Sequence, residues 1–300
     1  MSLTEIRRQL HRPAGLSLTT GPFVVTVRSP IAAVARSLLR LYADFALVSP
    51  TAFSDFHLRV APPATLRRWI RPQVFFHFDQ TIPFKPLPRS QAYPLFEWGF
   101  NYAISTTAHR YLIIHAAVVE RGGRGLILPG PPGSGKSTLC ATLIHSGWRL
   151  LSDELALIDL TSGLLAPIPR PVSLKNDSIE LIRQRFADAV LSDPCHDTQK
   201  GTVAHLKPPT ASVELAHRMV EPAWVVMPRY RSGSRSRLRP VPKGEMLMQL
   251  AEQSFNYTIL GARGFEVLAD LVERCSSHRL IYSDLDIALD RLDQLTGMTP

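Results

Sequence analysis

The sequence predicts an α/β protein of two parts, an N-terminal α/β domain over residues 1–108 and a second α/β domain over 109–300. Apolar, β-branched runs alternate along the chain with segments whose apolar residues recur at helical spacing. A glycine-rich stretch at 130–137 stands between an apolar run and a helical pattern. A hairpin signal precedes that stretch, so we expect the sheet around it to be mixed and not wholly parallel.

The bulk composition is that of a globular protein. Of 300 residues, 45% are hydrophobic and 20% are charged, which is ordinary for this class. No apolar run reaches the roughly 18 residues that a spanning helix requires, and the N-terminus lacks the apolar core of an export signal, so neither membrane insertion nor export is expected. The three cysteines, Cys140, Cys195 and Cys275, are too widely spaced for a metal site, and free thiols fit a cytoplasmic location.

The N-terminal elements follow from local patterns. Residues 23–30, "FVVTVRSP", are β-branched and apolar and end at a proline, which predicts a strand. Residues 31–45 place apolar side chains at helical spacing. The next expected elements, in chain order, are strands over 55–63 and 73–79, a proline-rich linker over 81–91 and a helix over 93–110. The aromatic residues of this region are expected to lie in the core.

The second domain opens with two apolar runs, 111–120 and 125–130, joined by "RGGR", which is typical of a hairpin. The next residues, "GPPGSGKS" at 130–137, match the phosphate-binding pattern G-x-x-x-x-G-K-[ST] in full, with the strand before and the helix after that this pattern needs. The sequence therefore predicts a nucleotide site.

Each residue type in this motif has a physical role. Glycines let the backbone curl so that successive N–H groups face phosphate oxygens, and the new helix adds the positive end of its dipole. Lys136 is expected to reach the β- and γ-phosphates, and the Ser137 hydroxyl to bind Mg²⁺. The residues expected to contact ATP are Gly130, Pro131, Pro132, Gly133, Ser134, Gly135, Lys136, Ser137 and Thr138.

Two adjacent acids, Asp153 and Glu154, follow after only one expected helix, inside the apolar run "GWRLLSDELALID". One interpretation is a polar strand end or turn. The other places a carboxylate beside Mg²⁺ and the γ-phosphate, where Asp153 can bind the metal or take the proton of an attacking hydroxyl. The second interpretation predicts phosphoryl transfer to an alcohol.

Residues 113–159, which contain this loop and both acids, resemble the catalytic core of the HPr serine kinase/phosphorylase family, and more closely the branch of HprK-related kinases (the A type). The shared features are His115 on the strand before the loop, the loop itself, Gly147 after the helix and the acid pair. Weaker likeness extends through "PRPVSLKNDSIELI" and "SFNYTILGARGFEVLADL".

The resemblance implies an HPr kinase/PEP carboxykinase-like P-loop core and a kinase that uses ATP and Mg²⁺ to phosphorylate a serine hydroxyl. It implies that Asp153 is the general base, with Glu154 and Lys136 also catalytic, and that His115 lies close to the acid pair. Without the resemblance, His115 in its apolar strand is better explained as a core histidine. Bifunctional members have two aspartates where this chain has Asp153 and Glu154. This departure leaves a precursor peptide or small carrier protein as credible an acceptor as HPr.

Further basic residues follow this core along the chain. Arg170 and Lys175 are candidates for an extra cation over the transferring phosphate, and His205 is expected to be structural. The segment 229–243, "RYRSGSRSRLRPVPK", holds six basic residues and no acid in a chain of net charge +9. It is either a solvated hairpin or loop, or a patch for an acidic peptide or phosphates. Nucleic acid is a weaker third choice because no binding module accompanies the charge.

Two other functions remain open at this point. One is a kinase for a small metabolite, and the other is a regulatory module in which nucleotide occupancy sets a binding surface without catalysis. Replacement of Asp153 by asparagine separates the last of these from a kinase, because a sensor needs no general base. GTP or pyrophosphate remains an alternative donor to ATP. The rings formed by the resembled family make a homo-oligomer an expected possibility.

Overall fold

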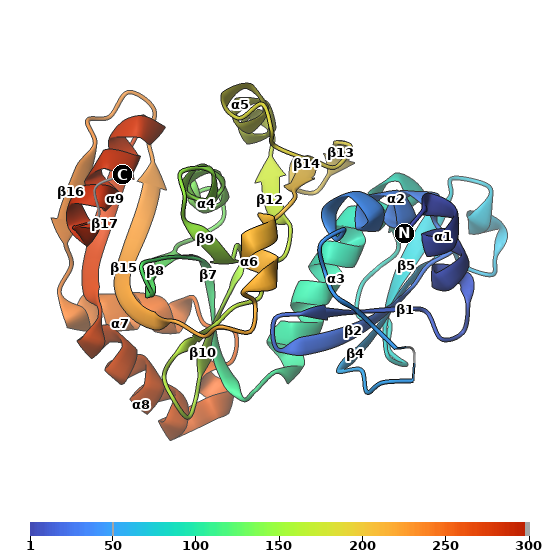
Figure 1. Ribbon diagram of the computed structural model, residues 1–300, viewed down its shortest axis with the longest axis horizontal. Helices are drawn as coiled ribbons and strands as arrows, with labels where there is room; N and C mark the ends of the chain where they lie inside the picture. The colour runs from blue at the N-terminus through green and yellow to red at the C-terminus, as the bar shows by residue number, and fades with distance from the viewer. Residues whose placement is uncertain (50, 298–300) are drawn as a thin grey trace. The chain divides into compact units, whose positions relative to one another are not determined.

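The computed structural model describes residues 1–49 and 51–297, and it is an α/β protein that divides into two compact units (Figure 1). The first unit comprises Met1–Thr107 together with Arg170–Leu215. The second comprises Ala108–Pro169 together with the residues from Ala216 onward. The sequence expectation places a single boundary between residues 108 and 109. In the structure the first segment of the first unit ends at residue 107, and residues 170–215 also group with the first unit, so the second unit is formed by two separate stretches of the chain.

The first unit is built on a six-stranded sheet with the order β3-β1-β2-β4-β5-β6, in which β2 and β4 are parallel and the other pairs antiparallel. Three helices accompany it: α1 (Leu3–His11), α2 (Ala32–Leu41) and α3 (Ala92–Thr107). The expected strands at 23–30, 55–63 and 73–79 and both expected helices are present. The strands are β1 (Leu16–Thr20), β2 (Phe23–Arg28), β3 (Leu47–Val48), β4 (Phe56–Ala61), β5 (Gln73–Phe78) and β6 (Leu87–Pro88), with short 3₁₀ turns η1 (Leu66–Arg68) and η2 (Arg89–Gln91).

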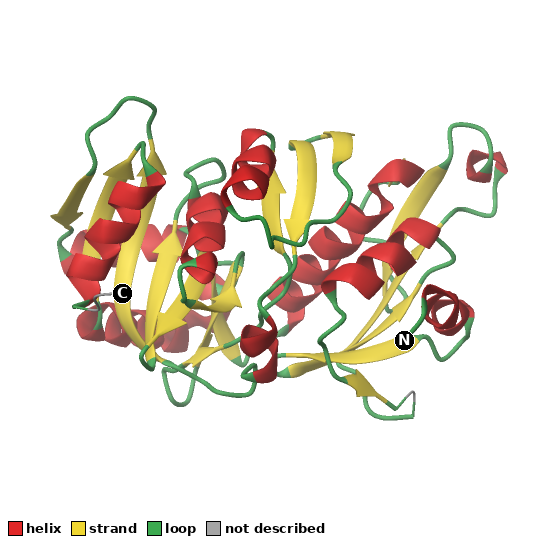
Figure 2. Cartoon of the chain, turned by 45° about the horizontal axis from the view of Figure 1, so that its top comes forward, coloured by secondary structure: helices red, strands yellow, loops and turns green. Residues whose placement is uncertain are grey.

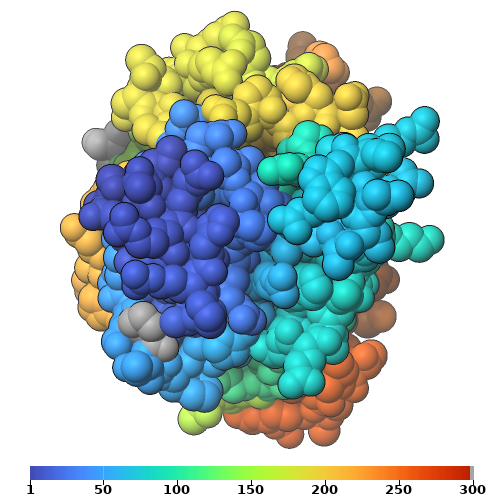
Figure 3. All heavy atoms as spheres, turned by 90° about the vertical axis from the view of Figure 1, so that its right-hand side faces the viewer, coloured from blue at the N-terminus to red at the C-terminus, as the bar shows by residue number. Residues whose placement is uncertain are grey.

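The inserted segment forms a small antiparallel sheet of its own, with the order β12-β14-β13. It is joined to α3 by a buried ion pair between Arg170 and Glu97, whose side chains are 8% and 4% exposed. In Figure 3, which draws the whole chain, this segment lies against the N-terminal residues of the same unit. This long-range pair is one of the contacts that hold the segment in the first unit. Its elements are β12 (Val172–Lys175), α5 (Asp177–Arg185), β13 (Cys195–Thr198), β14 (Gly201–Leu206) and α6 (Thr210–Glu214).

The second unit contains an eight-stranded sheet with the order β11-β10-β7-β8-β15-β17-β16, and β9 also pairs with β7. Strands β8, β15 and β17 are mutually parallel, whereas β7 is antiparallel to β8, so the sheet is mixed, as the hairpin signal predicts. The strands are β7 (Tyr111–Arg121), β8 (Arg124–Pro129), β9 (Arg149–Ser152), β10 (Leu155–Asp159), β11 (Leu165–Ala166), β15 (Glu221–Tyr230), β16 (Arg237–Pro240) and β17 (Ser276–Tyr282).

Helices lie on both faces of this sheet (Figure 2). They are α4 (Lys136–His145), α7 (Lys243–Glu252), α8 (Tyr257–Arg274) and α9 (Leu285–Thr296). Helices α7 and α8 contribute Met246, Leu250 and Leu268 to a buried core that also contains Ile127 of β8 and Val225 of β15. Burial of this apolar surface is the main driving force that holds the helices against the sheet. Within the described residues, no helix has both the length and the apolarity that crossing a bilayer requires.

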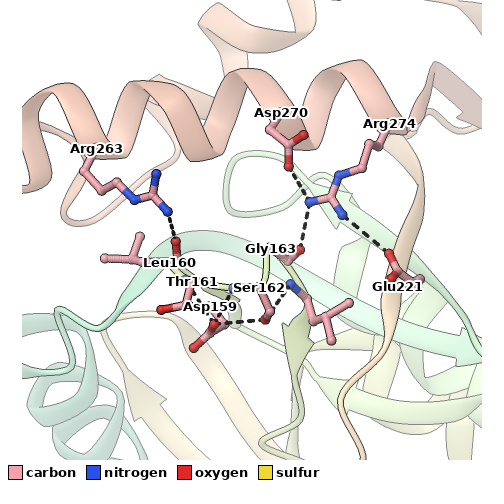
Figure 4. Close-up of polar contacts among 10 residues, drawn as sticks. Asp159, Leu160, Thr161, Ser162, Gly163, Glu221, Arg263, Asp270 and Arg274 are labelled. Carbon is pink, nitrogen blue, oxygen red and sulfur yellow. Dashed lines mark hydrogen bonds and ion pairs between the residues drawn. The ribbon is translucent and has the colours of Figure 1, made fainter.

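Helix α8 is tied to the turn between β10 and β11 by two arginines (Figure 4). Arg274 pairs with Asp270 at 2.6 Å and donates to the carbonyl oxygen of Gly163 at 3.2 Å. Arg263 donates to the carbonyl oxygen of Leu160. These contacts fix the far end of β10, the strand that begins directly after the acid pair.

The turn itself is organised by Asp159. Its carboxylate accepts hydrogen bonds from the amides of Thr161 and Ser162, at 3.1 and 2.8 Å, and from the Ser162 hydroxyl at 2.9 Å. Burial alone would raise the pKa of Asp159, but the hydrogen bonds from Ser162 and Thr161 outweigh it and lower that pKa. The turn is therefore held by a carboxylate that stays ionised.

Candidate functional site

Residues 130–135 form the loop between β8 and α4, which we call the glycine-rich loop. All three of its glycines have a left-handed backbone, with φ of 152° at Gly130, 83° at Gly133 and 96° at Gly135. A Cβ atom at Gly135 would lie 2.3 Å from the hydroxyl of Tyr282, whereas one at Gly133 would meet nothing within 4 Å. Gly135 is therefore required both by its backbone conformation and by a close neighbour.

Two tyrosines from distant strands support this loop. The Tyr282 hydroxyl donates to the carbonyl oxygen of Gly135 at 3.1 Å, and the Tyr230 amide donates to the carbonyl oxygen of Ser134 at 2.9 Å. The two rings meet edge to face with centroids 5.7 Å apart. Burial, followed by the proximity of Tyr230, raises the pKa of Tyr282 well above its ordinary value, so the hydroxyl remains a donor. The sequence did not single out Tyr230 or Tyr282, because neither residue belongs to a local sequence pattern that indicates contact with the loop.

Helix α4 begins at the end of the loop. Gly135 is its N-cap residue and Lys136 is its first residue. The Lys136 ammonium is buried, with the residue 7% exposed, and donates to the carbonyl oxygens of Gly130 and, at 3.1 Å, Pro131. Pro131 is exposed, as are the adjacent Pro132 and Gly133, so this end of the loop faces solvent. The first amides of α4 and the positive end of its dipole thus meet the loop, an arrangement that suits an anion.

The structure brings Ser137 and Asp153 together. The Ser137 hydroxyl donates to Oδ2 of Asp153 at 3.2 Å, and Asp153 is only 5% exposed. The acid pair lies in a bend between β9 and β10, where the Leu155 amide donates to the Ser152 hydroxyl at 3.1 Å. The chain passes directly from α4 into β9, which explains why so few residues separate the loop from the acids. Thr138, also expected at the site, lies in the first turn of α4, where its carbonyl oxygen accepts from Thr142.

His115 lies on β7 directly opposite Leu155, the residue that follows Glu154. Its amide donates to the carbonyl oxygen of Gln253 at 2.8 Å, and its ring packs 5.9 Å from that of Phe255. The side chain is half-buried, and so is Glu154. This register places His115 on the strand beside the one that follows the acid pair, and the contact with Phe255 gives its side chain a packing role.

The side-chain oxygens near the glycine-rich loop can be compared with the ligands that nucleotide-bound Mg²⁺ requires. Within the described residues, no group of three or more His, Cys, Asp or Glu side chains could hold a metal ion. Mg²⁺ in nucleotide sites does not need such a group, because it keeps water and phosphate ligands and takes one or two protein oxygens. The Ser137 hydroxyl and the Asp153 carboxylate, 3.2 Å apart, are oxygens of the right kind. These residues fit Mg²⁺ bound with a nucleoside triphosphate.

Three other residues singled out in the sequence, Arg170, Lys175 and His205, lie in the first unit. Arg170 forms the buried pair with Glu97, so it is not an exposed cation available to a phosphate. His205 is 1% exposed and packs edge-on against Tyr93 at 5.1 Å, which agrees with its expected structural role. The basic segment is ordered: it comprises the end of β15, a turn and the strand β16.

Residues 100–167 match the model of a family described as SynChlorMet cassette protein ScmC. The matched residues run from the end of α3 through β7, β8, the glycine-rich loop and α4 to β11. They include His115, Lys136, Ser137 and the acid pair. None of the curated proteins compared matches the chain.

Proposed function

We propose that the second unit is a P-loop kinase core that transfers the γ-phosphate of ATP to a serine-type hydroxyl of a small protein or precursor peptide. The observation that carries this proposal is the hydrogen bond between Ser137 and Asp153 at the start of α4. It joins the end of a complete phosphate-binding motif to a buried carboxylate, which is the combination that phosphoryl transfer to an alcohol requires.

The roles follow from the residues present. Bound ATP with Mg²⁺ supplies the phosphoryl group that is transferred. The loop amides and Lys136 hold phosphate oxygens, with the lysine exchanging the carbonyl oxygens of Gly130 and Pro131 for them. Ser137 and Asp153 are the residues that would hold the metal.

In the transfer step, the acceptor oxygen forms a bond to the γ-phosphorus while the bond from that phosphorus to the bridging oxygen of ADP breaks. The acceptor proton passes to the carboxylate oxygen of Asp153 that does not bind the metal, so that Asp153 is the general base. Glu154, the next residue, adds negative charge beside it, and His115, opposite Leu155, orients the pair from β7. Lys136 and the α4 dipole offset charge on the phosphates.

The acceptor class draws support from the family match. The matching family is described as a cassette protein, so the first acceptors to test are small proteins and peptides encoded beside this chain. The cytoplasmic location expected from the sequence agrees with the three free, buried cysteines. A small-metabolite kinase is the alternative, and it differs only in the acceptor that receives label.

The experiment is transfer of γ-labelled phosphate from ATP to those peptides, run on the full chain. Asp153→Asn is expected to abolish transfer while ATP-analogue binding, measured by fluorescence, changes by less than about tenfold. Asp188→Asn, an exposed aspartate in the first unit, is the matched control and is expected to behave as the parent protein.

Two results would reject the proposal in different ways, and a third would invalidate the assay. Label in a small alcohol and in no peptide would make the protein a metabolite kinase. Tight ATP binding without transfer to any acceptor, unaffected by Asp153→Asn, would make it a nucleotide-dependent binding module. Loss of ATP binding in Asp188→Asn would mean that the assay reports folding and not the site.

A further inference from the structure

A group of arginines lies on one face of the second unit's sheet, next to the glycine-rich loop. Strand β15 ends at Tyr230, whose amide donates to Ser134 of the loop. The chain then crosses the end of β17, where the Arg231 amide donates to the carbonyl oxygen of Tyr282 at 2.8 Å. It returns as β16, the last strand in the sheet order. The basic segment is therefore fixed to the loop at one end and to the sheet at the other.

The strand registers place the arginine side chains on a common face. Ile281 of β17 is paired with Arg229 of β15 on one side and with Arg237 of β16 on the other. Residues paired directly across strands project to the same face of a sheet. Arg239, two residues beyond Arg237, shares that face by strand alternation. We call Arg229, Arg237 and Arg239 the arginine face.

The neighbouring set of residues paired across these three strands shows which face of the sheet carries the arginine face. It contains Met227, Arg279 and Arg239. Met227 packs against the core formed with α7 and α8, and Arg279 pairs with Glu245 of α7 at 2.8 Å. The arginine face thus lies on the α7 side of the sheet.

The charge of this face is not neutralised within the part of the chain that the structure describes. Arg229, Arg237 and Arg239 are exposed, and none of them forms an ion pair among the described residues. The neighbouring acidic side chains have other partners. Glu245 pairs with Arg279, and the Asp284 carboxylate caps α9 by accepting hydrogen bonds from the amides of Asp286 and Ile287. Charged side chains on an edge strand such as β16 also discourage pairing with a strand of another molecule. This role does not account for Arg229, because β15 lies inside the sheet.

We propose that the arginine face is a docking surface for an acidic segment of the peptide acceptor, an inference that rests on the proposed kinase function. Guanidinium groups bind carboxylates through paired hydrogen bonds. Alternate residues of an extended strand are about 7 Å apart, both in β16 and in an extended peptide, so acidic residues at alternate positions can face Arg237 and Arg239 together. Across β17, Arg229 lies about 10 Å from Arg237, which extends the surface toward the loop.

The experiment measures binding separately from transfer. A fluorescein-labelled peptide of alternating glutamate and serine is titrated with the full chain and followed by anisotropy at low and physiological salt. The triple variant Arg229→Gln, Arg237→Gln and Arg239→Gln is expected to weaken binding about tenfold or more. Its control carries the same charge change on the exposed arginines of the first unit, Arg7→Gln, Arg8→Gln and Arg12→Gln, and is expected to stay within about twofold of the parent protein.

The outcomes separate this inference from the proposed function. Equal loss in both triple variants would show a net-charge effect and overturn the docking surface. Tighter binding of a single-stranded oligonucleotide of equal charge would assign the face to nucleic acid, and a parallel loss of ATP-analogue affinity would assign it to the nucleotide. If a peptide acceptor is phosphorylated with unchanged KM by the arginine-face variant, the docking surface is wrong and the kinase stands. If the acidic peptide binds through these arginines but nothing is phosphorylated, docking stands and the kinase is wrong.

Discussion

Replacement of Arg170 by methionine tests how the inserted segment is held in the first unit. Its guanidinium pairs with the Glu97 carboxylate, donates to the Glu97 carbonyl oxygen at 3.1 Å and to Asn101 at 2.6 Å, and stacks 4.1 Å from the centre of the Phe100 ring. Methionine retains much of the apolar contact with Phe100 but removes every donor. The carboxylate of Glu97 is then left buried with a reduced set of partners.

The size of the loss in unfolding free energy depends on the partners that Glu97 keeps in the variant. Breaking a buried pair by removing one partner typically costs about 3–5 kcal/mol, because the remaining charge is uncompensated. Here the hydroxyls of Tyr42 and Tyr93 still donate to Glu97, at 2.9 and 2.6 Å. We therefore expect the lower end, about 3 kcal/mol of unfolding free energy. With a denaturant slope of about 1–3 kcal/mol/M, the urea midpoint of the first unit should fall by about 1–3 M.

The double variant Glu97→Gln with Arg170→Met separates the ion pair from packing. A neutral amide still accepts from both tyrosines, so the double variant should recover most of the loss and lie within about 1 kcal/mol of the parent protein. The assay is urea unfolding combined with hydrogen exchange, which assigns the change to a unit. Faster exchange is expected in α3 and β12 and not in α4. A loss below about 1 kcal/mol for Arg170→Met, or equal changes in both units, would refute the reasoning.

Two further perturbations act on the second unit. Gly135→Ala places a Cβ atom 2.3 Å from the Tyr282 hydroxyl at a left-handed backbone position, so ATP-analogue affinity should fall at least about tenfold. Gly244→Ala, where a Cβ atom meets nothing within 4 Å, is the control, and equal effects of the two substitutions would contradict this account. Burial, followed by the charge of Asp153, raises the pKa of Cys140, and burial raises that of Cys275 to about 12, so both thiols stay protonated at about pH 8. Both should therefore react slowly with a thiol reagent until urea exposes them, and fast labelling of the folded chain would show that these thiols are not buried.

The parts predicted from the sequence are those whose signals are contiguous. The hairpin of β7 and β8, the glycine-rich loop and the start of α4 follow one another directly, and their glycines, apolar runs and lysine carry the information locally. The acid pair was singled out for the same reason, because α4 leads straight into β9. In the first unit, β-branched and apolar runs were sufficient for β2, β4 and β5.

The parts that sequence reasoning missed depend on contacts between distant residues. The place of Arg170 after the acid strand suggested a cation for the phosphate, yet its charge is used by Glu97 on α3. The support of the loop by Tyr282 depends on a bond to a residue 147 positions away. The arginine face depends on the register of three strands, two of which are not neighbours in the chain. No local pattern encodes such pairings.

The strand order has a consequence for the peptide on which both proposals depend. The acid pair lies beside β7 on one side of the loop, and the arginine face lies around β17 on the other. Passing from β9 over β7, β8 and β15 to β17 spans four strand spacings, about 20 Å. An extended peptide covers this distance in about six residues, so the acceptor hydroxyl should stand at least about six residues from the acidic segment. Phosphorylation of a series of peptides with spacers of increasing length should therefore show an optimum at or above that value, because shorter spacers cannot reach Asp153 while docked. A rate that does not depend on spacer length would mean that docking and transfer use different surfaces.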